Sequence, residues 1–227
     1  MKKVLIIAAH PDDEVLGCGG TMARHVLEGD NVSVHILAEG VTSRDQNRDK
    51  NLREKELLDL KSLAVNANKV LGVKSVSFHN FSDNRMDGIE LLEVVKVVEK
   101  ITDETKPDII YTHYVGDLNV DHQVISKAVV TATRPLPGAR NPMVLFFEIP
   151  SSTEWQTPSL NSFFPNWFIN VSDTLELKLK ALKEYKSELR DWPHPRSLDY
   201  VEYLAKIRGA SVGVDAAESF VLNRLII

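Results

Sequence analysis

The chain has a single cysteine, Cys18, among its 227 residues. One thiol cannot form a disulfide within the chain, so packing and hydrogen bonding must stabilise the fold. Such sparing use of cysteine fits a reducing compartment, and the cytoplasm is the expected location.

Long apolar runs are also missing. The apolar run near the start, Val4–Ala9, is cut by a His-Pro-Asp-Asp-Glu segment, so it is too short for a signal peptide or a membrane span and fits a buried strand. No stretch of about 18 or more consecutive apolar residues occurs anywhere, which argues against a membrane span.

An excess of positive charge is absent as well, because 27 Lys and Arg residues stand against 32 Asp and Glu residues, for a net charge of -5. Nucleic acids usually select a basic face, so we do not expect one as a partner. With 43% hydrophobic residues, a chain of this length can bury one sizeable core. We therefore expect a single domain over residues 1–227.

The pattern that is present is an alternation of short apolar or β-branched runs with longer segments of helical period. It predicts an α/β fold of the doubly wound, Rossmann-like type, with a mostly parallel sheet and flanking helices. The expected strands are Val4–Ala8, Val32–Leu37, Ser75–Phe78, Ile109–Thr112 and Val144–Phe147. The expected helices between them are Glu14–Glu28, Arg48–Leu71, Gly88–Thr102 and His122–Thr133.

The pattern weakens after the fifth strand. Pro150–Pro165 reads as a long loop, and a C-terminal helical extension over about 173–212 follows, with helices at Asp173–Arg190 and Ser197–Ser211. Two prolines in the Trp192–Pro195 run forbid a continuous helix there. The loop between these helices could fold back over the edge of the sheet.

Two clusters of histidine and aspartate follow strand ends. His10, Asp12 and Asp13 come directly after the first strand, at the edge where such sheets bind ligands. Imidazole and carboxylate are both zinc ligands, and catalytic zinc sites keep three protein ligands with one open position. His10 and Asp13 could supply two of them and leave Asp12 free as a base.

A third ligand is expected beyond the fourth strand, where both His113 and His122 are available. We favour His122, because it lies at the start of the next helix, whereas His113 sits on the strand end and could pair with a carboxylate. The alternative interpretation is that these residues only cap helices, since aspartates suit helix N-termini. That alternative has to explain two such clusters at two strand ends.

The run Ala9-His-Pro-Asp-Asp-Glu-Val-Leu-Gly-Cys-Gly-Gly20 resembles the opening signature of the LmbE-like (PIG-L) zinc-dependent N-deacetylases. Further agreement, across most of the chain, comes from Gly40–Arg44, Leu71–Val73, Arg196-Ser197, Ala205 and Arg208-Gly209. The resemblance implies a Rossmann-like fold, zinc on His10, Asp13 and His122, and Asp12 as general base. It also implies an N-acetylglucosamine conjugate as substrate and suggests a homo-oligomer.

The second motif departs from the family pattern. The family usually has His-Pro-Asp-His, and its first histidine is thought to polarise the substrate or to protonate the leaving amine. Here that position is Asn119, followed by Val120, Asp121 and His122. We hypothesise that His194 or His113 takes the missing role.

Other candidates for substrate contact are weaker. Arg44 follows the second strand and could contact a sugar or phosphate, but solvated loop arginines are common. Arg53 lies three residues before Glu56, a spacing typical of a solvated helix face. Asp83 follows the third strand, so it could hold a substrate hydroxyl or simply favour a turn.

Composition and spacing alone lead to metal-assisted hydrolysis, with phosphoester or other amide substrates still open. Zinc is the preferred metal, although two histidines and a carboxylate also suit non-haem iron. With the resemblance, the leading hypothesis is a zinc-dependent N-deacetylase of a small amino sugar or its conjugate. The alternatives are a metal-dependent hydrolase of a different amide and a catalytically silent zinc-binding protein. The asparagine at position 119 keeps the silent alternative open.

Overall fold

The computed structural model describes residues 1–226 except 45, 47, 50 and 158–161, and its centre is a sheet of seven strands. Strands β1 to β5 run parallel, and β7 is antiparallel to both of its neighbours. The predicted α/β class with a mostly parallel sheet is therefore confirmed. In sheet order the strands are β3 (Ser75–Phe81), β2 (Asn31–Ala38), β1 (Lys3–Ala8), β4 (Ile109–His113), β5 (Met143–Phe147), β7 (Ala217–Arg224) and β6 (Trp167–Asn170).

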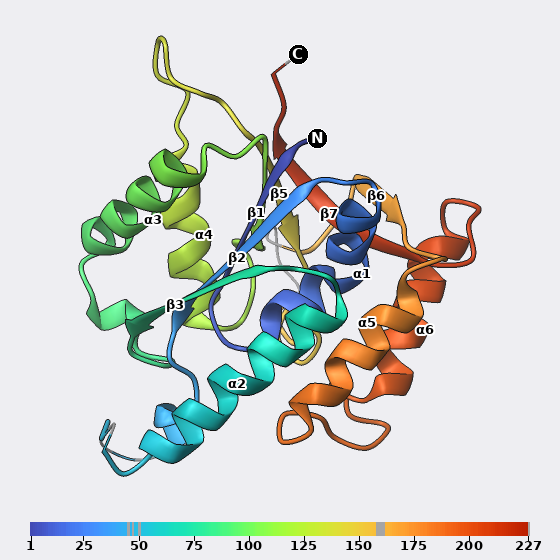
Figure 1. Cartoon of the computed structure of the whole chain (residues 1–227), viewed down its shortest axis with the longest axis horizontal. Helices are drawn as coiled ribbons and strands as arrows, with labels where there is room; N and C mark the ends of the chain where they lie inside the picture. The colour runs from blue at the N-terminus through green and yellow to red at the C-terminus, as the bar shows by residue number, and fades with distance from the viewer. Residues whose placement is uncertain (45, 47, 50, 158–161, 227) are drawn as a thin grey trace.

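Helices cover both faces of this sheet (Figure 1). Adjacent residues of β1 point to opposite faces, so Ile6 belongs to the apolar cluster under one helical layer and Leu5 to the cluster under the other. One layer contains α1 (Asp13–Leu27), α2 (Glu54–Val70), α5 (Leu175–Leu182) and α6 (Leu198–Ala210), and the other contains α3 (Leu91–Thr105) and α4 (Val120–Ala132). No helix among the described residues is long and apolar enough to cross a membrane.

The order of the strands fixes where a ligand can bind. The chain places β2 and β3 on one side of β1, and β4 and β5 on the other. The loops that follow β1 and β4 therefore leave the sheet where the direction of winding reverses, which is the crevice that open α/β sheets use for ligands.

Several expected helices begin or end elsewhere. Before α2, Asp49 Oδ1 accepts hydrogen bonds from the backbone N–H groups of Asn51 (2.9 Å) and Leu52 (3.4 Å), a local turn that competes with helix. The expected helix Arg48–Leu71 is reduced to Glu54–Val70, and the expected helix His122–Thr133 begins at Val120. The expected helix Gly88–Thr102 is found at Leu91–Thr105, after a 3₁₀ turn at Met86–Gly88. The expected helix Asp173–Arg190 is shorter, at Leu175–Leu182, and a 3₁₀ turn at Lys183–Tyr185 follows it.

The two antiparallel strands were not predicted. β6 lies just beyond the expected long loop, and β7 follows the expected helical extension. β7 inserts between β5 and β6, so the chain returns to the sheet after α6. Its polar residues Glu218 and Ser219 are buried, which removes the alternation of apolar and polar residues that would mark a half-buried strand.

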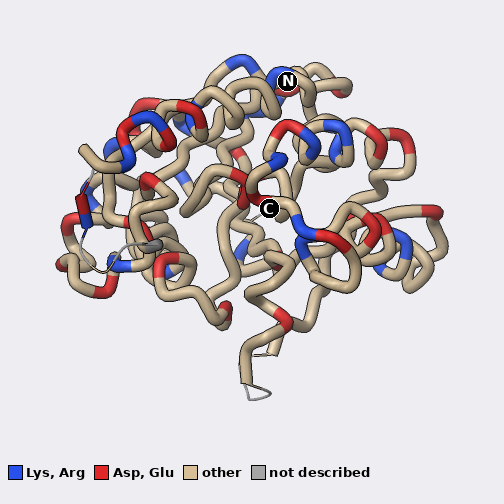
Figure 2. Tube along the Cα trace, turned by 90° about the horizontal axis from the view of Figure 1, so that it is seen from below, with Lys and Arg blue, Asp and Glu red and all other residues tan. Residues whose placement is uncertain are grey.

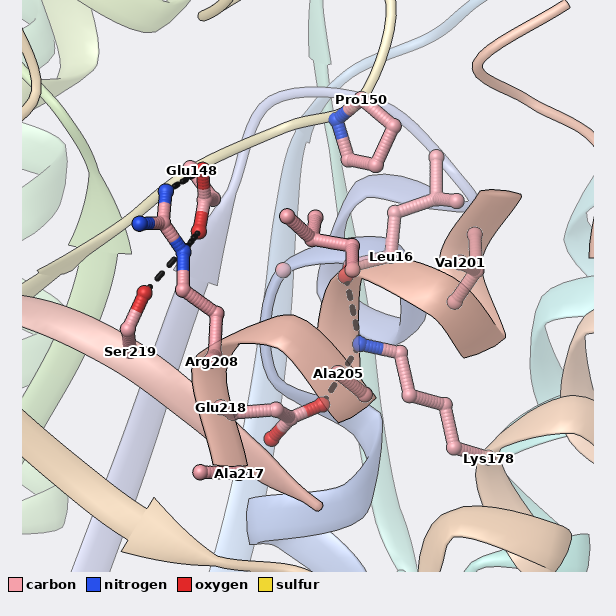
Figure 3. A pocket seen from close by; sticks show the side chains of 12 residues that line it. Leu16, Glu148, Pro150, Lys178, Val201, Ala205, Arg208, Ala217, Glu218 and Ser219 are labelled. Atoms are coloured by element: carbon pink, nitrogen blue, oxygen red, sulfur yellow. Dashed lines mark hydrogen bonds and ion pairs between the residues drawn. The ribbon is translucent and has the colours of Figure 1, made fainter. Parts of the chain in front are cut away.

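A buried ion pair joins α1 to the C-terminal part of the chain (Figure 3). Helix α1 is kinked at Cys18, where φ is -148°. Lys178 donates to the carbonyl of Leu16 (2.8 Å) and to Glu218 (2.6 Å), and Glu218 accepts from the N–H groups of Gly20 (3.0 Å) and Thr21 (2.7 Å). Backbone groups that the kink leaves free thus find partners on α5 and β7.

Close contact of α1 with the sheet generates a stability prediction. A Cβ at Gly17 would stand 2.5 Å from a ring carbon of Phe147, which is fully buried. Gly17→Ala should lower the free energy of unfolding by about 1–3 kcal/mol through overpacking, although alanine is the better helix former. Urea unfolding followed by circular dichroism measures this. Gly88→Ala, where a Cβ meets nothing within 4 Å, is the control, and equal stability of the two variants would contradict the expectation.

Candidate metal centre and active site

A polar cavity of about 120 Å³ opens at the carboxyl ends of β1 and β4. Its walls come from the loops that follow β1, β2, β3 and β4, from α2, and from the C-terminal segment before α6. The lining residues are His10, Pro11, Asp12, Gly40, Val41, Ser43, Leu60, Asp83, Asn84, Asn119, Glu188 and Arg196.

His10, Asp13 and His122 meet beside this cavity. Asp13 Oδ2 lies 3.1 Å from both His10 Nδ1 and His122 Nε2, and one donor atom of each residue falls within 4.8 Å of the other two. Asp13 and His122 are buried, while 12% of the His10 side chain is exposed. Two imidazoles and a carboxylate form a donor set that suits a first-row transition metal.

Unpaired atoms at this cluster also fit a metal ion. Among the described side chains, Asp13 Oδ1 and His122 Nε2 are buried and make no hydrogen bond. The 3.1 Å approach of His122 Nε2 to Asp13 is a charge contact without hydrogen-bond geometry. Buried polar atoms without partners are costly, and a cation between them would satisfy both.

Carboxylates support the outer nitrogens of both histidines. His10 Nε2 lies 3.0 Å from Asp121 Oδ2 and 3.3 Å from Asp83 Oδ1. His122 Nδ1 lies 3.1 Å from Asp117 Oδ1, a charge contact that, like the one at Nε2, lacks hydrogen-bond geometry. Such carboxylate–histidine pairs orient metal-binding imidazoles in known sites. The group His10, Asp83 and Asp121 also has donor atoms close enough to hold a cation, so the region is rich in anionic oxygen.

The negative charge at the cluster shifts the pKa values of its members. Burial lowers the pKa of His122, but Asp13 and Asp117 outweigh burial and raise it to about 9. Burial likewise lowers the pKa of His10, and its three carboxylate neighbours raise it well above the ordinary value. For Asp13, burial raises the pKa and the neighbouring histidines lower it well below its usual range. The cluster therefore favours positive charge, whether protons or a metal ion.

Asp12 stands next to this cluster in a rare backbone conformation, with φ at 113°. Arg196 Nη1 donates to Asp12 Oδ2 (2.8 Å), and Arg196 Nε donates to Ser151 Oγ (2.8 Å). Burial raises the pKa of the Asp12 carboxyl to about 8; Arg196 opposes that shift and Asp13 adds to it. A carboxyl that titrates near neutral pH can both accept and return a proton.

Two other predicted residues lie in the cavity wall. Asn119 is the N-cap of α4, where its Oδ1 accepts from the N–H of Asp121 (2.9 Å), and its Nδ2 donates to Asn84 Oδ1 (2.8 Å). Asp83 accepts from the N–H of Ser43 (2.8 Å) and from Asn84 Nδ2 (2.9 Å). Both side chains are held by protein partners and also border the space where a ligand would lie.

The remaining predicted histidines are placed differently. His113 is fully buried against His122, with ring centroids 3.8 Å apart, and its Nε2 accepts from the N–H of Ala9 (2.8 Å). It does not line the cavity. His194 is partly buried, its Nδ1 accepts from the N–H of Arg196 (3.0 Å), and its ring meets the edge of Trp155. His194 is also not one of the residues that line the cavity, but it lies beside Arg196, which is.

Of the two predicted arginines, Arg53 is not among the described residues that line the cavity. Arg53 precedes α2 and pairs with Glu56 at 2.6 Å, which is the surface pair that their spacing indicated. The backbone of Arg44 closes a 3₁₀ turn at Thr42–Arg44, and its side chain lies outside the described part of the structure.

Sequence reasoning did not assign a role to Arg196 or Asp117, and it did not foresee that Asp83 and Asp121 lie beside His10. Asp117 is buried and is held by Ser152 and Thr153, and Asp121 accepts from the N–H groups of Asn84 (2.6 Å) and Met86 (3.0 Å). Two signals for Arg196 were available: Arg196-Ser197 agrees with the family, and the proline-containing turn before it was expected to fold back over the edge of the sheet.

Comparison with known proteins finds matches to deacetylases. The sequence model described as PIG-L, GlcNAc-PI de-N-acetylase, matches residues 5–133. The uncharacterized deacetylase YaiS of Escherichia coli K12 is 30% identical over 192 residues, covering 82% of this chain and 91% of YaiS. The diacetylchitobiose deacetylase of Thermococcus kodakarensis is 25% identical over 198 residues, covering 83% of this chain and 70% of that enzyme.

Among solved structures, the 4-carboxy-2-hydroxymuconate hydratase GalB of Pseudomonas putida KT2440 matches with a TM-score of 0.80 at 20% identity, over 100% of this chain and 98% of GalB. At that identity the likeness concerns the fold alone. The family match covers more than half of the chain, and YaiS is similar over most of its length. The chain therefore belongs to the PIG-L, or LmbE-like, family of deacetylases.

Proposed function

We propose that the chain is a zinc-dependent hydrolase that removes the acetyl group from the nitrogen of an N-acetylated amino sugar or its conjugate. The observation that carries this proposal is the position of Asp12. Its carboxyl lines the cavity immediately beside the His10, Asp13 and His122 cluster and is separate from it. A purely structural zinc site would be closed by a fourth protein ligand and would need no additional carboxyl group.

His10, Asp13 and His122 would hold the zinc ion through His10 Nδ1, a carboxylate oxygen of Asp13 and His122 Nε2. When bound, zinc supplies a Lewis acid for the acyl oxygen and lowers the pKa of a water molecule toward 7, from about 16. Asp83, Asp121 and Asp117 would keep the two imidazoles oriented through their outer nitrogens.

Asp12 then serves as general base. Arg196 occupies Asp12 Oδ2, so the proton from the attacking water can be held at Oδ1. A cation at the neighbouring cluster would lower the raised pKa of Asp12 and favour its ionised form. As the C–N bond breaks, the same proton can pass to the departing amine, which leaves acetate and a free amino sugar.

The cavity wall suits a sugar. Ser43, Asp83, Asn84 and Asn119 place hydroxyl, carboxylate and amide groups around a space with little apolar surface. Such groups can donate to and accept from sugar hydroxyls. The family description and the diacetylchitobiose deacetylase support an N-acetylglucosamine unit as the acylated part of the substrate.

The leaving amine could also receive its proton from a histidine. Asn119 can donate a hydrogen bond but cannot serve as an acid, and His113 is sealed behind His122. His194 is the better helper, because its Nδ1 accepts a hydrogen bond, which leaves a ring proton on Nε2 that can be donated in a hydrogen bond to polarise the substrate. The asparagine at position 119 is the observation that favours a second candidate function, a metal-binding protein without turnover.

The central prediction concerns metal and base together. Metal-stripped protein should release acetate from N-acetylglucosamine conjugates only after zinc is added back. Asp12→Asn should lower kcat by about 100-fold or more while zinc still binds, because the base is lost and the ligands remain. Asp103→Asn is the matched control, because it changes an exposed carboxylate of α3 that does not line the cavity. Zinc binding without release from any conjugate would refute the deacetylase and favour the silent protein.

Metal binding should depend on pH. Because the pKa of His122 is raised to about 9 in the metal-free chain, its ring is largely protonated at pH 7. Zinc binds neutral imidazole, so each binding event must expel a proton, and the apparent affinity should fall as pH drops below about 9. Calorimetry in buffers of different ionisation enthalpy counts the protons released at pH 7. A count of zero would contradict the ligand assignment of His122.

The helper hypothesis has its own test. His194→Ala should lower kcat at saturating substrate by about 10- to 100-fold, a typical contribution of one proton donor. Asn119→His in the His194→Ala background should restore part of this loss by returning the family's histidine to its usual position. If His194→Ala leaves kcat unchanged, Asp12 carries the proton to the amine alone.

A further inference from the structure

The backbone of Asp12 is held away from its preferred conformations. Its φ of 113° and ψ of -32° lie in a region that residues with a side chain rarely adopt. A conformation of this kind persists only where surrounding contacts determine it, and it occurs preferentially at functional sites. The contacts of Asp12 therefore indicate which residues maintain this conformation.

Hydrogen bonds fix both backbone groups of Asp12, its carbonyl and its N–H. On the carbonyl side, Asp12 accepts from the N–H groups of Val15 (3.1 Å) and Leu16 (2.9 Å), which begin α1. On the amide side, the Asp12 N–H donates to Glu14 Oε2 (3.1 Å). Rotation about the N–Cα bond of Asp12 would break one of these two sets.

Glu14 is itself anchored from two distant elements. Its side chain is fully buried, and its Oε1 accepts from Tyr185 Oη (2.6 Å) and Asn68 Nδ2 (2.9 Å). Asn68 belongs to α2 and also donates to the carbonyl of Ala64 (2.9 Å), whereas Tyr185 ends the 3₁₀ turn after α5. Both anchoring side chains are buried, so the position of the Glu14 carboxylate is fixed by the packing of these two elements against α1.

We infer that Glu14 is a positioning residue for the proposed deacetylation: it holds the Asp12 amide in the strained conformation that presents the Asp12 carboxyl to the cavity. Tyr185 acts in turn through Glu14, since its hydroxyl reaches the carboxylate and not Asp12. The inference rests on the proposed function, because it gives the strain at Asp12 a purpose in proton transfer.

A simpler interpretation is that Glu14 only satisfies a free N–H at the start of a helix, as acidic residues in the first turn often do. In that case its loss would cost stability and nothing more. Glu218 allows the two interpretations to be separated. It is also a buried carboxylate that accepts two backbone N–H groups of α1, those of Gly20 and Thr21, but it does not contact Asp12.

The experiment compares Glu14→Gln with Glu218→Gln in the zinc-loaded protein, at temperatures where both are folded. Glu14→Gln should lower kcat by about 10- to 100-fold with little change in KM, since a misplaced base affects the chemical step. Zinc stoichiometry should stay at the wild-type value. Glu218→Gln should keep kcat within about twofold of the wild-type value, whatever stability it loses.

Two further variants test the path from Tyr185. Tyr185→Phe should give a smaller fall in kcat than Glu14→Gln, because Asn68 still holds the carboxylate. Tyr185→Phe added to Glu14→Gln should cost nothing more, as expected for residues that act through one contact. Additive effects of the two substitutions would overturn the proposed path.

A readout without catalysis keeps this inference distinct from the proposed function. Amide hydrogen exchange of Asp12, measured in the metal-free and zinc-loaded protein, should speed up by about tenfold or more in Glu14→Gln and stay slow in Glu218→Gln. If wild-type protein releases no acetate, the proposed function fails. If it does, and Glu14→Gln loses no more kcat than Glu218→Gln or leaves Asp12 exchange slow, the positioning role is wrong.

Discussion

A buried carboxylate at the switch point of the sheet organises the rest of the site. Asp13 is completely buried, and a charge in that position has to be compensated by close partners. The partners are His10 from the end of β1 and His122 from the start of α4. Their outer nitrogens lie beside Asp83, Asp121 and Asp117. Asp121 in turn holds the backbone of the loop after β3, and Asp117 accepts from the hydroxyl groups of Ser152 and Thr153 in the loop after β5.

Local sequence was sufficient for the parallel part of the fold. The runs that form β1, β4 and β5 are mostly apolar because helices cover both faces, and that pattern shows in the sequence without knowledge of the partners. β6 and β7 could not be found in this way. Glu218 is buried in β7 because Lys178 of α5 neutralises it, and Ser219 because its hydroxyl donates to Glu148. Strand formation there follows from tertiary contacts that no local window contains.

The same division applies to the site. His10, Asp12 and Asp13 were identified because their position after β1 places them at the binding edge, and His122 was identified for the matching reason after β4. Arg196 lies 184 residues from Asp12 in sequence, so no spacing could connect the two. Asn119 shows a further limit, since one side chain caps α4 and also borders the cavity, and the sequence motif reveals neither contact.

Acidic and basic residues are intermixed along the chain seen from below (Figure 2). The pairing of Asp12 with Arg196 therefore depends on topology and not on a charged face.

The residues of the site are also synthesised at different times. All three candidate metal ligands have been synthesised by residue 122, whereas Arg196 is added only after α5. A nascent chain thus carries its metal-binding groups well before the group that restrains its base, and the two halves of the site become a single unit only when the C-terminal segment closes over the sheet.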